Sequence, residues 1–195
     1  AGGTGDIAFR IHNKTGGQAD ITVCDINADM LRNGKARAID RGILSGITWM
    51  QGDAEKLPYE DNSFDVYTIS FGLRNVTRID NALAEAFRVL KPGGRFYCLE
   101  FSKVQNPLLG GAYDLYSRAF IPKFGKVIAK DADSYQYLVE SIRKFPPQDE
   151  LKRRMQDAGF ERVSYSNLSF GIAAIHSGYK LKKTEKTDED QSPNT

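Results

Sequence analysis

The opening stretch AGGTGD at residues 1–6 is the feature that most restricts how this chain can fold. It is followed by DIAFRI, whose apolar residues suit a helix packed on a sheet. A glycine turn that opens a helix lets the backbone approach a ligand closely, because no Cβ intervenes and the helix N-terminus offers free N–H groups. A turn with a purely structural role can have the same sequence pattern. The pattern therefore marks a candidate ligand site and does not identify the ligand.

Two cofactors fit this turn. Residues 3–8, GTGDIA, match the G-x-G-x-x-G/A fingerprint of dinucleotide-binding folds. Asp25 ends the strand-like run ITVCD, 20 residues after Gly5, where a carboxylate can accept hydrogen bonds from ribose hydroxyls. The same arrangement suits an S-adenosylmethionine (AdoMet) site, so both cofactors stay open at this point.

The first hundred residues alternate strands and helices at the spacing of βαβ units, which predicts a parallel, doubly wound α/β sheet. The expected strands cover 19–25, 46–53, 64–73 and 95–101, and the expected helices after the opening one cover 28–42 and 78–90. The run at 64–73 is almost continuously apolar, as in strands buried on both faces of a parallel sheet. A glycine turn normally follows a strand, and the sequence lacks an initiator Met. We therefore expect a fragment from which the first strand is missing.

The second half predicts a change of architecture. The aromatic-rich segment 103–146 is expected to form a substrate lid within one domain at 1–181, with an ordinary helix packed on the core as the alternative. A helix at 147–160 precedes strands at 161–168 and 171–181, which are joined by a short corner. Such a short link requires an antiparallel hairpin, because a parallel return needs a crossover of about a dozen residues. A parallel sheet closed by an antiparallel last strand favours the Rossmann-like class I AdoMet-dependent methyltransferase fold.

Composition excludes several classes of protein. The net charge of +2 is spread along the chain and gives no reason to expect nucleic-acid binding, and no run of 18 apolar residues predicts a transmembrane helix.

Cys24 and Cys98 lie in strand-like runs and are expected to be buried and reduced. His12 and His176 are isolated, so no metal site is expected. The polar tail 182–195 is expected to be disordered.

Several stretches together resemble the quinone-biosynthesis C-methyltransferases. This group acts as demethylmenaquinone methyltransferase and as 2-methoxy-6-polyprenyl-1,4-benzoquinol methylase. The matching stretches are AGGTGDIAFR, VCDIN, GDAEKLPYEDNSFD, FGLRNV, EAFRVLKPGG, LEFS, YLVESIRKFP and AIHSGYK, which cover nearly all of residues 1–181. AGGTGD and KPGG occur across many methyltransferases, whereas FGLRN and YLVESIRKFP are far more particular to this group.

The resemblance implies a set of AdoMet contacts. They fall on the glycine turn with Gly3, Thr4 and Gly5, on Asp25, on Asp53 with Ala54, and on Ser70. Asp25 would accept the ribose hydroxyls and Asp53 the adenine amine, while Ser70 lies at the end of a strand, where open α/β sheets bind ligands. Each position also has a plain structural interpretation: Asp25 as part of helix capping, Asp53 as a turn residue, and Ser70 as a core hydroxyl.

The resemblance also implies the chemistry, which is methylation of a quinol ring carbon without a metal. Its candidate catalytic residues are Arg74 and Asn75, which follow the strand that carries Ser70. A guanidinium is effectively always protonated, so Arg74 is expected to stabilise a phenolate or hold a water rather than act as a literal base. The alternative for Arg74 is a surface charge that caps the next helix. Tyr113, Tyr116 and Tyr135 are expected near the quinol.

The expected partners follow from the same resemblance. They are a polyprenyl quinol, a peripheral contact with a membrane, and either a homodimer or a quinone-synthesis complex. The expected location is the bacterial cytoplasm or inner membrane, or the matrix side of a mitochondrial membrane. The rival functions are a nicotinamide-dependent dehydrogenase, a sterol-type or other small-molecule methyltransferase, and a non-catalytic AdoMet-binding subunit.

Overall fold

The computed structural model describes residues 1–103 and 132–182, and at 132–135 it describes the backbone alone. The elements in chain order are α1 (Asp6–Lys14), β1 (Ile21–Asp25), α2 (Ala28–Asp40), β2 (Ile47–Gln51), β3 (Phe64–Ser70), η1 (Leu73–Asn75), α3 (Ile79–Val89), β4 (Leu90–Phe101), α5 (Ala132–Lys144), α6 (Gln148–Asp157), β5 (Glu161–Leu168), η3 (Ser169–Gly171) and β6 (Ala173–Tyr179). Most of the expected lid, and all of the expected tail 182–195 except Lys182, therefore lie outside the described residues.

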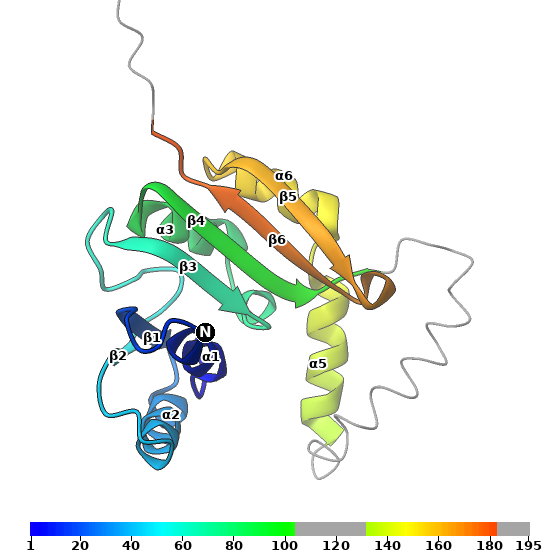
Figure 1. The fold of residues 1–195 in the computed structure, drawn as a ribbon. Helices are drawn as coiled ribbons and strands as arrows, with labels where there is room; N and C mark the ends of the chain where they lie inside the picture. The colour runs from blue at the N-terminus through cyan, green and yellow to red at the C-terminus, as the bar shows by residue number, and fades with distance from the viewer. Residues whose placement is uncertain (104–131, 183–195) are drawn as a thin grey trace, which may run out of the picture.

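The strands form two sheets whose directions agree with the sequence pattern (Figure 1). β1 and β2 pair in parallel, with Ile21 opposite Ile47. The second sheet has the order β3-β4-β6-β5, and β3 and β4 are parallel. β6 runs antiparallel to both of its neighbours. The prediction of a doubly wound α/β fold closed by an antiparallel last strand is confirmed.

The expectation that 64–73 is buried on both faces is wrong. The strand ends at Ser70, and Val66 within it is 53% exposed. The cause is the position of β3, which is an edge strand of its sheet among the described residues. The first two residues of the chain are bonded to β1, since the Ala1 amino group and the Gly2 backbone N–H donate to the Cys24 carbonyl oxygen at 3.1 and 2.8 Å.

The KPGG segment also differs from its expected role as a simple helix stop. α3 ends at Val89, and the strand begins at once at Leu90, opposite Phe64. The register then shifts, so that Val66 lies opposite Arg95. Hydrogen bonds between the glycines of KPGG and the end of β6, including Lys180 N–H to the Gly94 oxygen at 2.9 Å, hold this irregular segment against the sheet.

The main core lies between the four-stranded sheet and the two helices behind it, α3 and α6 (Figure 1). Leu83 of α3, Leu151 and Met155 of α6, and Phe96 of β4 are all fully buried there. Phe96 stacks on Phe160 with ring centroids 5.1 Å apart. α3 buries one face because its apolar residues recur at helical spacing. The position of the carboxyl ends of β3 and β4 is thus fixed by a well-packed core.

One buried polar contact ties α6 to β6. His176 is 2% exposed, and its Nε2 lies 3.0 Å from the carbonyl oxygen of Gln148. A neutral imidazole with a proton on Nε2 donates to that oxygen. Burial lowers the pKa of His176 below its ordinary value, against the opposing effect of the contact with Gln148.

This lowered pKa predicts that the protein loses stability as the pH falls. Below about pH 6.5 the unfolded chain binds a proton at this histidine that the folded chain resists, so the free energy of unfolding should decrease. The expected slope is at most about 1.4 kcal/mol per pH unit, the value for one proton. Chemical denaturation between about pH 7.5 and about pH 5.5 measures it.

The matched variants for this experiment are His176→Gln and His12→Gln. His176→Gln should flatten the slope because the titrating group is gone. His12→Gln, which replaces the half-buried histidine of α1, is the comparison variant that removes the other histidine of the chain. An unchanged slope in His176→Gln would contradict the assignment.

Candidate functional site at the carboxyl ends of the strands

The glycine turn directly precedes α1 and packs closely against residues of β1 and β2. Gly5 is the N-cap residue of α1 with φ of 83°, a conformation that residues with a Cβ adopt at a cost. A Cβ at Gly5 would also lie 2.6 Å from Cη2 of Trp49, which comes from β2. The turn therefore needs glycine at this position for both its backbone conformation and its packing.

The side-chain hydroxyl of Thr4 is bonded within the protein, whereas its backbone N–H is not. Its hydroxyl donates to Asp6 at 3.2 Å and accepts a hydrogen bond from Arg37. Arg37 and Asp6 form an ion pair at 2.7 Å that joins α2 to α1, and the hydrogen bond from Arg37 lowers the pKa of Asp6. Within the described residues, the Thr4 backbone N–H has no protein acceptor. A ligand at this turn would therefore meet the N–H of Thr4 rather than its hydroxyl.

Asp25 connects the turn to the ends of two strands. Its Oδ2 accepts the Gly3 N–H at 2.8 Å, and its Oδ1 accepts the Asn27 N–H at 2.9 Å. Its carbonyl oxygen accepts the Gly52 N–H at 3.1 Å, next to Asp53. Each carboxylate oxygen has a second lone pair, so the carboxylate can still accept hydrogen bonds from hydroxyl groups. The capping interpretation is partly realised, because Asn27 is the N-cap of α2.

Asp53 takes part in a tight turn directly after β2. Its Oδ1 accepts the Glu55 N–H at 2.9 Å, and its carbonyl oxygen accepts the Lys56 N–H at 3.0 Å. The side chain of Asp53 is exposed, while Ala54 packs against the main core. This arrangement anchors the turn through Ala54 and leaves the second carboxylate oxygen of Asp53 facing outward.

The loop that follows is fastened to α3. Glu85 accepts the Leu57 N–H at 2.7 Å, and Arg88 donates to the carbonyl oxygens of Leu57 and Tyr59 at 3.1 and 2.7 Å. Arg88 and Glu85 are themselves paired at 2.7 Å, and this hydrogen bond lowers the pKa of Glu85. α3 therefore fixes the loop, and with it the position of Asp53.

Ser70 ends β3, where it is half-buried and pairs with Leu99. The backbone then turns sharply, with Phe71 at φ of 53°. At Gly72 a Cβ would overlap the side chain of Ala1, so the glycine turn touches the loop after β3. Together with the bonds of Asp25, this contact brings all the predicted cofactor residues to one rim. We call this rim, formed by the glycine turn and the ends of β1, β2 and β3, the cofactor rim.

Arg74 is neither a surface charge nor a helix cap. Its side chain is 11% exposed, and Nη1 lies 3.0 Å from Oε1 of Glu100, at the end of β4. Its carbon Cζ lies 5.3 Å from the centroid of the Phe101 ring. Burial raises the pKa of the Glu100 carboxyl, and the nearby Arg74 acts in the opposite direction. The sequence interpretation missed Glu100, although a carboxylate inside the apolar run RFYCLEF was a usable signal.

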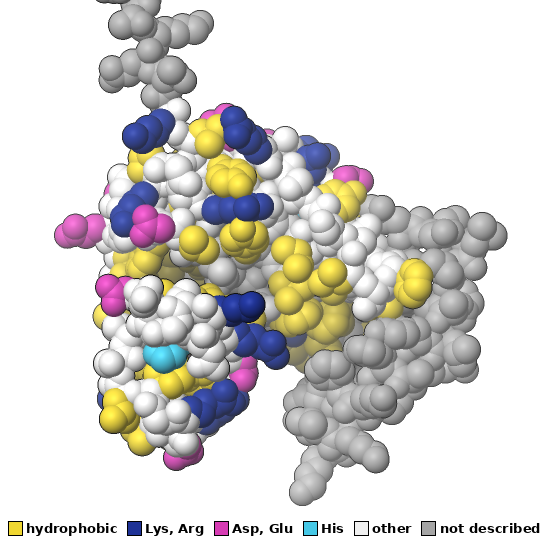
Figure 2. Space-filling model, viewed as in Figure 1, with side chains coloured by type: hydrophobic (Ala, Val, Ile, Leu, Met, Phe, Trp, Pro, Cys, Tyr) yellow, Lys and Arg dark blue, Asp and Glu magenta, His cyan; other side chains and the backbone are white. Residues whose placement is uncertain are grey.

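Asn75 lies beside α5. Its Oδ1 accepts a hydrogen bond from the Tyr137 hydroxyl at 3.4 Å, and Tyr137 is 59% exposed. Figure 2 shows apolar side chains gathered where α5 meets the carboxyl ends of β3 and β4. Of the tyrosines expected near the substrate, Tyr113 and Tyr116 lie outside the described residues, as does the side chain of Tyr135. Tyr137 is the tyrosine that the described residues bring to the candidate catalytic pair.

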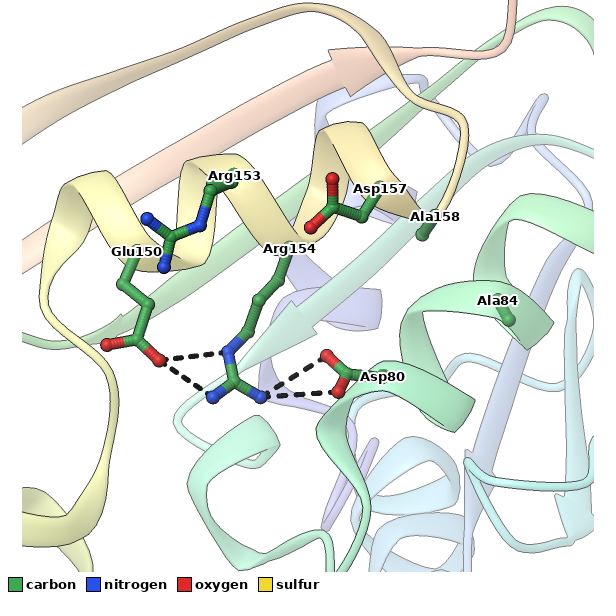
Figure 3. Close-up of a pocket in the computed structure, with 7 residues that line it drawn as sticks. All are labelled: Asp80, Ala84, Glu150, Arg153, Arg154, Asp157 and Ala158. Atoms are coloured by element: carbon green, nitrogen blue, oxygen red, sulfur yellow. Dashed lines mark hydrogen bonds and ion pairs between the residues drawn. The ribbon is translucent and has the colours of Figure 1, made fainter.

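A surface depression of about 450 Å³ lies elsewhere, between α3 and α6 (Figure 3). Within it Arg154 donates to Glu150 of its own helix at 2.7 Å and to Asp80 of α3 at 3.3 Å. Neither the glycine turn nor the end of any strand contributes to it. Its polar residues form an ion-pair network that joins two helices. The depression does not coincide with the cofactor rim, so the shape of the surface alone would not identify that rim.

Comparison with known proteins gives the family. Residues 1–180 match the ubiE/COQ5 methyltransferase family. Proteins of Brucella abortus (strain S19) and Brucella melitensis biotype 2, both called ubiquinone/menaquinone biosynthesis C-methyltransferase UbiE, are 60% identical over 181 residues. The matched region is 93% of this chain and 67% of each relative.

Solved structures agree on the fold at much lower identity. The [4+2]-cyclase SpnF is 18% identical with a TM-score of 0.67, covering 93% of this chain and 73% of that one. A methyltransferase from Thermotoga maritima, described as a possible histamine N-methyltransferase, is 24% identical with a TM-score of 0.60, covering 92% and 78%. The fold is therefore that of class I AdoMet-dependent methyltransferases. From the match over residues 1–180 and the identity to these relatives, this chain belongs to the ubiE/COQ5 methyltransferase family.

Proposed function

We propose that this chain transfers the methyl group of AdoMet to a ring carbon of a polyprenyl quinol. As a member of its family the chain is an AdoMet-dependent C-methyltransferase of ubiquinone and menaquinone biosynthesis. Our proposal adds the acceptor, a benzoquinol or a naphthoquinol, and the residues that act on it. The observation that carries it is the side chain of Arg74, which is only 11% exposed and lies beside Asn75, next to the cofactor rim.

The residues of the rim fit AdoMet. We assign the ribose hydroxyls to the free lone pairs of Asp25 and the methionine end to the turn with Gly3, Thr4 and Gly5. The N–H of Gly3 is already used by Asp25, so Thr4 provides the free backbone donor. The turn of Asp53 and Ala54 would take the adenine, and Ser70 would face the cofactor from the end of β3. The second lone pairs and the unpaired N–H support this assignment.

The catalytic assignment rests on charge and position. Bound AdoMet supplies a methyl group on a positively charged sulfur. The quinol ring carbon attacks only when the ring carries phenolate character, so a fixed positive charge beside the phenolic oxygen lowers the barrier. Arg74 provides that charge, and Asn75 orients the quinol together with Tyr137. The burial of Arg74 strengthens its effect, because water screens it less.

The proposal extends to where the protein works. No helix in the described ranges is long and apolar enough to cross a membrane. Its polyprenyl substrate is a membrane lipid, and we propose peripheral contact with a bacterial inner membrane or the matrix side of a mitochondrial one. Leu168 and Phe170, exposed at the β5–β6 corner with Phe170 at 83%, support such a contact. Assembly as a homodimer or within a quinone-synthesis complex is part of the same proposal.

The direct test is methyl transfer to defined acceptors. The full chain is incubated with AdoMet and, separately, a short-chain benzoquinol and a short-chain naphthoquinol, and mass spectrometry identifies the products. We expect a product that has gained one methyl group on a ring carbon from at least one quinol. Binding of AdoMet without a methylated product from either quinol would overturn the proposal.

Asp25→Asn should weaken AdoMet binding about tenfold. The substitution removes the charged group that would accept the ribose hydroxyls. The NH2 donor of the new amide would also face the N–H donor of either Gly3 or Asn27. Isothermal titration with AdoMet measures the effect. The matched control is Asp65→Asn, an exposed aspartate of β3 paired with Lys91, which should bind AdoMet normally. Equal affinity of Asp25→Asn and the control would contradict the assignment.

Arg74→Ala should lower kcat about 100-fold, the usual loss on removing one stabilising donor from a transition state. The affinity for AdoMet should change less than about threefold, because Arg74 lies outside the rim. Steady-state kinetics with the quinol and titration with AdoMet separate the two effects. Unchanged turnover would remove Arg74 from the mechanism.

A further inference from the structure

Glu100 is a fully buried carboxylate that the proposed chemistry does not yet use. It lies at the end of β4 and is 1% exposed. Its neighbours in the strand, Leu99 and Phe101, are apolar, and Ala174 of β6 lies opposite it. Burying a charge of this kind costs free energy that a single ion pair often fails to recover. A buried pair at this position therefore calls for an explanation other than stability.

The carboxylate holds Arg74 at two points. Its Oε1 accepts from Nη1 of Arg74 at 3.0 Å, and its Oε2 accepts from the Arg74 backbone N–H at 3.2 Å. A third hydrogen bond, from the Phe101 N–H at 2.9 Å, fixes the carboxylate itself. Glu100 thus orients both the short helix η1 and the guanidinium that projects from it.

These contacts use one edge of the guanidinium. Nη1 also donates to the Phe71 carbonyl oxygen, and the guanidinium lies near the Phe101 ring, with Cζ 5.3 Å from its centroid. All guanidinium hydrogen bonds among the described residues belong to Nη1. Nε is buried and has no partner in the described parts of the chain. The donors that remain for a ligand are therefore Nε and Nη2.

We propose that Glu100 is a positioning residue for methyl transfer, which fixes the Arg74 guanidinium so that Nε and Nη2 serve the developing phenolate. The inference rests on the proposed function and adds a residue to it. A guanidinium held in place before the reaction needs no reorganisation when charge develops on the quinol oxygen. The negative charge of Glu100 also weakens the field of Arg74 at that oxygen. Orientation of the guanidinium should raise kcat, and weakening of its field should lower kcat. The kcat of a Glu100 variant therefore shows which effect is larger.

The test compares Glu100→Gln with the unchanged protein and with Arg74→Gln. Glu100→Gln should lower kcat about tenfold while the affinity for AdoMet stays within about twofold, because only the orientation of Arg74 is lost. In the Arg74→Gln background, Glu100→Gln should cause no further loss. A merely structural role predicts instead that the two losses multiply. Faster or unchanged turnover in Glu100→Gln would overturn the proposal.

A second variant covers the case in which Glu100→Gln fails to fold. Glu100→Asp keeps the charge but withdraws the carboxylate by one methylene, so it should retain the melting temperature better while still lowering kcat. Turnover of Glu100→Asp equal to that of the unchanged protein would also overturn the proposal. Glu150→Gln, which breaks the pair with Arg154 within α6, is the matched control and should keep normal kcat.

The outcomes also separate this inference from the proposed function. Normal turnover in Arg74→Gln would remove the function proposed for Arg74, and Glu100 would lose its target with it. Slow turnover in Arg74→Gln together with normal turnover in Glu100→Gln would remove only the positioning role. In the second case Arg74 would act without help from Glu100.

Discussion

The hydrogen bonds of Asp25 are the interaction on which the rest of the site depends. One short side chain fastens the glycine turn at Gly3, and the carbonyl oxygen of the same residue fastens the end of β2 at Gly52. The N–H groups of Gly3 and Gly52 are half-buried, and backbone donors withdrawn from water need a protein acceptor. A carboxylate serves better than a neutral group because charged acceptors form stronger hydrogen bonds. The cofactor rim is therefore built around a residue that is also expected to bind the cofactor.

The two halves of the site handle charge in different ways. On the cofactor rim, Asp25 is stabilised by backbone donors and keeps lone pairs for a ligand. Beyond β3, Arg74 is stabilised by a second buried side chain, Glu100, and keeps N–H donors for a ligand. The first arrangement presents acceptors and the second presents donors. This polarity suits a reaction between a cofactor rich in hydroxyl groups and an acceptor that becomes an anion.

The sequence predicted the local elements well, because each depends on neighbouring residues. Asn27 caps α2 as its residue type suggests, and β6 reverses direction because the SFG corner is too short for a crossover. The exposure of β3 could not be predicted, since it depends on which strand lies beside it. The carboxylate in RFYCLEF pointed to Glu100, but its partner could not be predicted for a similar reason. The pairing with Arg74 joins residues far apart in the chain, and only packing shows how little of either side chain is exposed.

The structural neighbours share the fold of this chain and carry different names for their activities. A cyclase and a methyltransferase proposed to act on histamine share the fold at TM-scores of 0.67 and 0.60, so the fold alone does not determine the reaction. A glycine turn and an acidic residue at the end of the next strand are general devices for binding a nucleoside. We propose that the residues that distinguish one acceptor from another lie apart from that rim, in η1, the end of β4 and the adjoining face of α5. There Arg74 contacts Glu100, and Asn75 contacts Tyr137.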